Sequence, residues 1–149
     1  MAVSAVNPNL SASTTAPRRY DLVDGDLQLR APSAAAISAT TAETAVELKA
    51  EKLSYYKAVV QYSAIGGTVD ASNYWTVNIE ASANNSTFVV VGSQKLAAAA
   101  DRLYIALEGE AVAAAMDVAA QGEALYVRVR AVETGTTAGN LDYFAYLTL

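Results

Sequence analysis

Apolar and polar residues alternate strictly in several short segments of the chain. The clearest is residues 74–81, whose predicted inward side chains are Trp75, Val77, Ile79 and Ala81, with Glu80 on the outward side. Side chains of a β-strand point alternately to its two faces, so this pattern predicts a half-buried strand. Asn84-Asn85 follows and leads into residues 87–91. The sequence therefore predicts a β-hairpin over residues 74–91.

Similar patterns predict further strands at residues 27–30, 44–49, 53–65, 103–107, 123–132 and 141–149. Gly, Asn and Asp mark the turns, and a Thr/Gly-rich turn at 134–140 precedes the last strand. Closely spaced short strands of this kind favour an all-β fold, either an antiparallel sandwich or a barrel, over a parallel α/β sheet. Of these we expect an antiparallel, jelly-roll-like β-sandwich of six to eight strands. The Ala-rich residues 110–121 carry apolar positions at helical spacing and predict one short helix or lid.

The first 19 residues differ from the rest in composition. They contain Pro8, Pro17 and a Ser/Thr run, with few residues that could bury much apolar area. Such a segment does not offset its own ordering entropy, so residues 1–19 are predicted to form a flexible or extended N-terminal arm. The length of 149 residues favours one further unit, a single domain over residues 20–149.

Composition narrows the chemistry that the chain can perform. It has no Cys and no His, which removes thiolate and imidazole nucleophiles, bases and metal ligands. We therefore expect no catalytic residues, no cofactor and no metal site. The net charge of −5 opposes binding to nucleic-acid phosphates, and we expect no membrane span and no export signal. The hydrophobic share of 53% overstates the core, because 32 residues are Ala.

Three groups of polar or aromatic residues are candidates for a binding or catalytic site, and each also has a simpler interpretation. Asp21, Asp24 and Asp26 surround Gly25 and fit a solvated turn better than a calcium site. The acidic residues Glu108, Glu110, Asp117 and Glu123 fit a solvated edge better than a glycosidase pair. Exposed aromatic rings could form a sugar-binding platform, whose candidates are Tyr55, Tyr74, Tyr126, Tyr143 and Tyr146. The nine Tyr and one Trp fit the filling of a core poor in Phe and Leu better than such a platform.

Several predicted strands are apolar on both faces. In the last strand Phe144 and Tyr146 alternate with other apolar residues, and between Lys57 and Lys95 only Asp70 and Glu80 are charged. A strand covered on one face by its partner sheet and on the other by another subunit gives this pattern. We expect self-association or docking onto a larger assembly.

The end of the chain carries a resemblance to a known family. Its three parts are Ala124-Leu125-Tyr126-Val127-Arg128-Val129-Arg130-Ala131, then Thr134-Gly135-Thr136-Thr137-Ala138-Gly139-Asn140, then residues 141–149. They resemble the terminal hairpin of small β-sandwich cement, or decoration, proteins of tailed-bacteriophage capsids. The similarity extends loosely over residues 53–131. It implies a binder of the capsid shell and brings no active-site residues with it.

The resulting hypothesis is a non-enzymatic structural protein of the virion, made in the host cytoplasm, that binds the outside of a phage capsid and bridges capsomers. Its expected partners are the major capsid protein and further copies of itself, with a trimer favoured over a dimer. The expected contact residues are Pro8, Leu10, Arg18, Arg19, Tyr20, Tyr126, Arg128 and Tyr146. The alternative is a carbohydrate-binding or tail-adhesin module.

Overall fold

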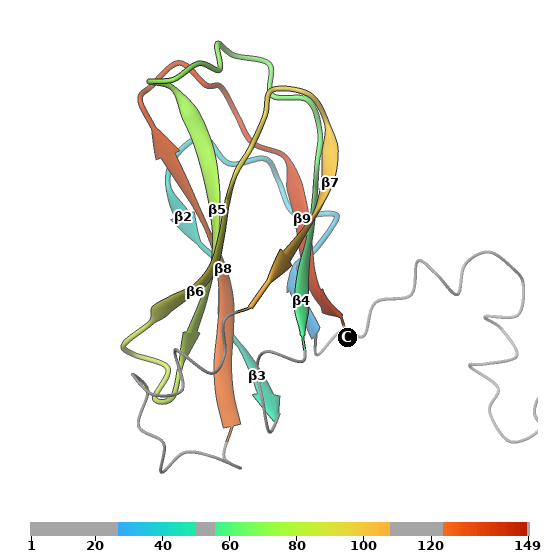
Figure 1. Ribbon diagram of the computed structural model, residues 1–149, viewed down its shortest axis with the longest axis vertical. Helices are drawn as coiled ribbons and strands as arrows, with labels where there is room; N and C mark the ends of the chain where they lie inside the picture. The colour runs from blue at the N-terminus through green and yellow to red at the C-terminus, as the bar shows by residue number, and fades with distance from the viewer. Residues whose placement is uncertain (1–26, 50–55, 108–123, 149) are drawn as a thin grey trace, which may run out of the picture.

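The computed structural model describes residues 27–49, 56–107 and 124–148, and these residues form an all-β structure (Figure 1). It contains nine strands: β1 (Gln28–Arg30), β2 (Thr41–Ala42), β3 (Val46–Lys49), β4 (Lys57–Tyr62), β5 (Tyr74–Ser82), β6 (Val89–Lys95), β7 (Asp101–Ala106), β8 (Ala124–Thr134) and β9 (Tyr143–Thr148). The expected arm at 1–19 and the expected helix or lid at 110–121 lie outside the described residues.

The strands form two antiparallel sheets that face each other in a sandwich-like arrangement (Figure 1). One sheet has the order β1-β9-β4-β7, and the other has the order β2-β8-β5-β6 with β3 also paired to β8. Four of the pairings are nested along the chain: β5 with β6, β4 with β7, β2 and β3 with β8, and β1 with β9. The chain is therefore folded back on itself as one long antiparallel ribbon that is wrapped into two sheets.

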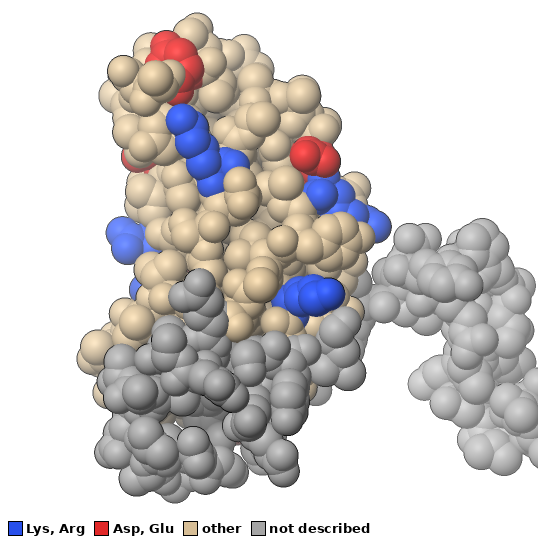
Figure 2. Space-filling model, in the orientation of Figure 1, with Lys and Arg blue, Asp and Glu red and all other residues tan. Residues whose placement is uncertain are grey.

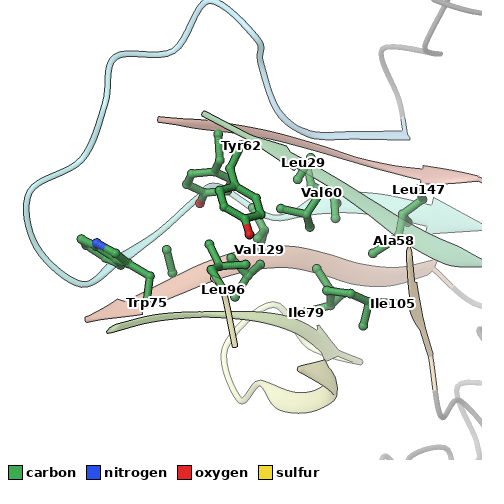
Figure 3. Packing of buried hydrophobic residues seen from close by; sticks show 14 of the residues in the cluster. Leu29, Ala58, Val60, Tyr62, Trp75, Ile79, Leu96, Ile105, Val129 and Leu147 are labelled. Carbon is green, nitrogen blue, oxygen red and sulfur yellow. The ribbon is translucent and has the colours of Figure 1, made fainter. Parts of the chain in front are cut away.

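The core fills the space between the two sheets (Figure 3). The four residues predicted to point inward from β5 are all fully buried: Trp75, Val77, Ile79 and Ala81. The facing sheet contributes Ala58, Val60 and Leu147, which belong to the same cluster. Alternation on each strand thus assigns its inner side chains, as the sequence predicts.

The predicted hairpin is confirmed, because β5 and β6 pair antiparallel across the Asn84-Asn85 turn. Asn85 has a φ of 55°, a left-handed conformation that Asn tolerates better than most residues. The strand number exceeds the predicted six to eight because β2 and β3 are separate segments along β8. β2 lies in a stretch of Ala, Ser and Thr whose sequence carries no strand pattern.

The terminal hairpin implied by the resemblance is wrong. β8 belongs to one sheet and pairs with β5, β2 and β3, whereas β9 belongs to the other and pairs with β1 and β4. The connection after β8 crosses from one sheet to the other, with Ala138 and Leu141 buried in the core. The indole Nε1 of Trp75 donates a hydrogen bond of 2.8 Å to the carbonyl of Gly139 and so fixes this crossing to β5.

Candidate interaction surface

The outer face of the β1-β9-β4-β7 sheet carries uncovered aromatic rings. Phe144 and Tyr146 project outward from β9, and their ring centroids lie 5.1 Å apart in a stacked arrangement. The strand pairings place Tyr146, Val59 and Tyr104 in one row across β9, β4 and β7. Val59 is only 1% exposed although it points away from the core. We call the surface formed by these four side chains the aromatic face.

Tyr104 stands at the edge of this face and is 63% exposed. It also lines a cleft of about 380 Å³ between β7 and β6, the outermost strands of the two sheets. Val90, 46% exposed, lies on the β6 side of the same cleft. The lining residues, all uncharged, are Val90, Val91, Gly92, Ser93, Gln94, Tyr104, Ile105 and Ala106.

Gly92 lets the two edge strands approach each other at this cleft. A Cβ atom at position 92 would lie 2.7 Å from Cγ2 of Ile105 and 3.1 Å from the carbonyl oxygen of Ala106. Only glycine therefore allows this distance between β6 and β7 without a shift. The exposed apolar side chains of Val90 and Tyr104 lie on the two sides of this cleft.

The charged groups among the outward residues of β9, β4 and β7 are both basic. Lys57 is exposed at one end of β4. Arg102 on β7 donates two hydrogen bonds from Nε and Nη2 to Oε1 of Gln61, at 3.1 and 2.8 Å. On the side shown in Figure 2, uncharged surface predominates and acidic side chains occupy small areas. The outward residues of β9, β4 and β7 therefore offer a partner mostly uncharged contact, with the two basic groups of Lys57 and Arg102.

The outer face of the other sheet is polar, and its one buried carboxylate among the described residues, that of Glu80, is paired with two arginines. The Glu80 carboxylate accepts a bond of 2.7 Å from Nε of Arg128 and lies 3.7 Å from Nη1 of Arg130. Arg128 also covers the ring of Phe88 at 3.8 Å. Glu80 is outward-pointing, as predicted, yet buried beneath these neighbours. Burying a carboxylate away from water is costly, and here the two guanidinium groups offset that cost by pairing with the charge.

A third cluster, of Arg30, Glu43 and Tyr143, lies buried at the β1 edge. Nη1 of Arg30 is 3.2 Å from Oε1 of Glu43, Nη2 donates to the carbonyl of Ala35, and the guanidinium lies 4.5 Å over the Tyr143 ring. Nε of Arg30 and the Tyr143 hydroxyl have no hydrogen-bond partner among the described residues. Burial, and secondarily the Glu43 charge, raise the pKa of Tyr143, while Arg30 opposes the rise. These contacts attach the segment after β1 to the sheet.

The expected contact residues do not form one site. Pro8, Leu10, Arg18, Arg19 and Tyr20 lie outside the described residues. Tyr126 and Arg128 project from β8, on the polar face. Tyr146 alone lies on the aromatic face, because β9 belongs to the other sheet.

The aromatic candidates for a sugar platform are also dispersed. Tyr143, expected to be exposed, is 2% exposed and points into the core, so this expectation is wrong. Tyr74 lies beneath the Lys95 ammonium at 3.8 Å. Tyr55 lies outside the described residues. Sequence reasoning missed Tyr104, although its alternation with Leu103 and Ile105 on β7 was available as a signal.

The remaining acidic candidates fall outside the described residues. They are Asp21, Asp24 and Asp26, together with Glu108, Glu110, Asp117 and Glu123. Within the ranges that the structure describes, no group of three or more His, Cys, Asp or Glu residues is placed to hold a metal ion. The same ranges contain no helix long and apolar enough to cross a membrane.

No protein-family model, curated protein or solved structure matches the chain.

Proposed function

We propose that this protein is a non-enzymatic structural component of a phage virion, which binds the outside of the capsid and stabilises it by bridging capsomers. The observation that carries the proposal is the aromatic face, continuous through Tyr104 with the uncharged cleft between β6 and β7. Exposed apolar surface of this kind is typical of protein–protein contact. In this proposal the major capsid protein covers it.

The strand order supports a jelly-roll assignment. If β2 and β3 count as one interrupted strand along β8, the described residues form eight strands. Their nested pairs join first with last, second with seventh, third with sixth and fourth with fifth. A ribbon of four nested antiparallel pairs wrapped into two sheets is the jelly-roll arrangement, which occurs in viral capsid and lectin domains. We therefore propose a jelly-roll β-sandwich as the fold.

The proposed mechanism is multivalent clamping. A copy that contacts two capsomers at once forms its second contact at a high effective concentration, so modest contacts combine into durable attachment. Self-association, with the trimer that we favour, would add further contacts per bound particle. Separation of the capsomers must then break several contacts together.

The test is co-sedimentation of the full chain with capsids that lack it. Tyr104→Ser removes the most exposed ring of the aromatic face and should weaken binding, because most of the buried apolar area at that position is lost. Tyr74→Ser is the matched control, since Tyr74 points outward from the other sheet. Unchanged binding of the Tyr104 variant, or equal loss in both variants, would remove the aromatic face from the proposal. Absence of binding by the wild-type chain would overturn the proposal itself.

A carbohydrate-binding or tail-adhesin function is the second candidate. The exposed ring of Tyr104 lies near the Gln61–Arg102 pair, which supplies polar groups beside an aromatic surface. Aromatic rings beside hydrogen-bonding groups suit the apolar faces and hydroxyls of sugars. Trp75 is fully buried and is a poor reporter. Oligosaccharide titration should instead shift the ring-proton resonances of Tyr104 and Tyr146 under this candidate and leave them unchanged under the first.

A further inference from the structure

β7 is an edge strand, and the hydrogen bonds of its sheet show which of its backbone groups point outward. Just beyond the last pair of β4 and β9, the amide of Ser63 donates a bond of 3.0 Å to the carbonyl of Asp142. Such bonds involve every second residue of an antiparallel strand, so Val60 directs its N–H and C=O away from β9 and toward β7. Its partner on β7 is Leu103. The residues on either side of Leu103 therefore direct their N–H and C=O away from β4, to the outer side of the edge.

Arg102 and Tyr104 form the open part of this edge. Both are exposed, and in the strand order of the described residues nothing pairs with the outer side of β7. Ala106 has the same backbone direction, but its carbonyl oxygen lies 3.1 Å from the position of a Cβ atom at Gly92, so β6 covers the strand there. Unpaired N–H and C=O groups of an edge strand are a template for pairing with another chain. The open part thus offers the N–H and C=O groups of two residues to a partner.

The other long edge, β6, is better protected. Its register shifts between Ile79 and Glu80 of β5, which leaves Val91 as an extra residue. A bulge of this kind bends a strand and is one of the usual devices against edge pairing. β7 instead keeps a continuous register with β4 over six residue pairs. An added strand therefore finds a regular backbone on β7 and an interrupted one on β6.

The charge beside the open edge is basic. Arg102 donates hydrogen bonds from Nε and Nη2 to Oε1 of Gln61, and these bonds hold the guanidinium beside the strand. The other charged outward residue of β9, β4 and β7 is Lys57, which is also basic. Asp101 belongs by alternation to the inward side of β7. Residues directly opposite each other on paired strands have Cβ atoms about 5 Å apart, so an acidic side chain opposite Arg102 would pair with its charge.

We propose that an extended segment of the capsid protein adds to β7 as a further strand of its sheet, with an acidic side chain opposite Arg102 and an uncharged one opposite Tyr104. Main-chain hydrogen bonds to these two residues supply affinity, and the charge of Arg102 selects the register. The outward side chains of the added strand extend the row of Tyr146, Val59 and Tyr104, and its inward side chains face the uncharged cleft. The capsid protein as the source of the strand rests on the proposed function.

Hydrogen exchange of single amides tests the strand addition without capsids. The probe is a synthetic, capped peptide of alternating valine and threonine with glutamate at its central threonine position, added to the isotope-labelled full chain. The amides of Arg102 and Tyr104 should exchange rapidly in the free chain and become protected when the peptide binds, whereas the Leu103 amide should be protected throughout. Protection of both open amides before the peptide is added, or of neither afterwards, would overturn the proposal.

A charge exchange tests the chemistry of the partner. The wild-type chain should bind the glutamate peptide about fivefold more tightly than a peptide with lysine at the same position. Arg102→Glu should reverse this preference. Lys95→Glu is the matched control, since it makes the same charge change at an exposed position on β6 and should leave the preference unchanged. A preference that persists in Arg102→Glu, or that both variants reverse, contradicts an acidic partner at this edge.

The strand addition and capsid binding can fail separately. Arg102→Glu should also weaken co-sedimentation of the full chain with capsids that lack it, and Lys95→Glu should not. Capsid binding that Arg102→Glu leaves at the wild-type level rejects the strand addition while capsid binding stands. Peptide binding by a chain that does not co-sediment with capsids rejects the capsid protein as the source of the strand.

Discussion

Replacing Glu80 by Ala should destabilise the protein far more than the same substitution at Glu47. Both residues point outward from the β8-β5 sheet, but the Glu80 side chain is 6% exposed and bridges Arg128 and Arg130, whereas Glu47 is exposed. Removing one partner of a fully buried ion pair costs about 3–5 kcal/mol. The two arginine side chains are 25% and 43% exposed, so water screens them and reduces the expected cost to about 1–3 kcal/mol.

Urea denaturation followed by circular dichroism measures this difference. With an m-value of about 2 kcal/mol/M, a loss of 2 kcal/mol lowers the midpoint by about 1 M, while Glu47→Ala should change the stability by less than about 0.5 kcal/mol. A double-mutant cycle of Glu80→Ala with Arg128→Ala should give a coupling of about 0.5 kcal/mol or more. Equal midpoints for the Glu80 and Glu47 variants would refute the reasoning that burial makes this carboxylate matter.

Three further predictions concern a buried hydroxyl, a glycine and an exposed carboxylate. Burial raises the pKa of Tyr143, so ionisation of its hydroxyl favours the unfolded chain, and the free energy of unfolding should fall as the pH rises above about 10. Tyr143→Phe should reduce that fall, as measured by denaturation across pH. At pH 7 the stability of this variant should equal that of the wild-type chain or exceed it by about 1 kcal/mol, because the hydroxyl has no hydrogen-bond partner among the described residues. Gly139 has a φ of 85°, and a Cβ atom there would lie 2.7 Å from the Gly67 nitrogen, so Gly139→Ala should lower the thermal unfolding midpoint. Gly66→Ala is the control and should leave the midpoint unchanged, because a Cβ atom at position 66 would meet no other atom within 4 Å. The backbone N–H of Ser72 donates a hydrogen bond to the Asp70 carboxylate and lowers its pKa. The folded state is therefore stabilised at pH values above the ordinary pKa near 4, and this stabilisation is lost as the pH falls. Acid denaturation should show a smaller loss of stability for Asp70→Asn than for the wild-type chain.

The inner side chains of strands could be predicted from sequence because they depend on a local property. Alternation with a period of two places Trp75 and Ile79 inside regardless of which strand lies next to β5. The turn at Asn84-Asn85 was likewise readable, since neighbouring strands joined by a short turn usually pair. These local rules account for most of the strands that the structure contains.

Pairing between distant strands follows no such local rule. The Thr/Gly-rich segment after β8 has the composition of a hairpin turn, yet it crosses between the sheets with Leu141 buried. Tyr143 looked like an exposed ring, but the crossing turns it into the core beside Arg30. Glu80 points outward, as predicted, but its burial beneath two arginines depends on the pairing of β5 with β8. In each case a residue 40 or more positions away decides the environment.

The two outer faces differ in how many of their side chains already have partners within the protein. On the polar face the buried Glu80 carboxylate is paired with Arg128, and the Lys95 ammonium lies over the Tyr74 ring, so a partner binding there would have to compete with these contacts. On the aromatic face Tyr104 is exposed, and the half-buried Tyr146 stacks on Phe144, with Val59 between the two tyrosines in the row. Covering that face releases water from apolar surface and breaks no ion pair. The exposed ring of Tyr104 and the uncharged cleft beside it therefore support the proposal that this protein works by contact with a partner.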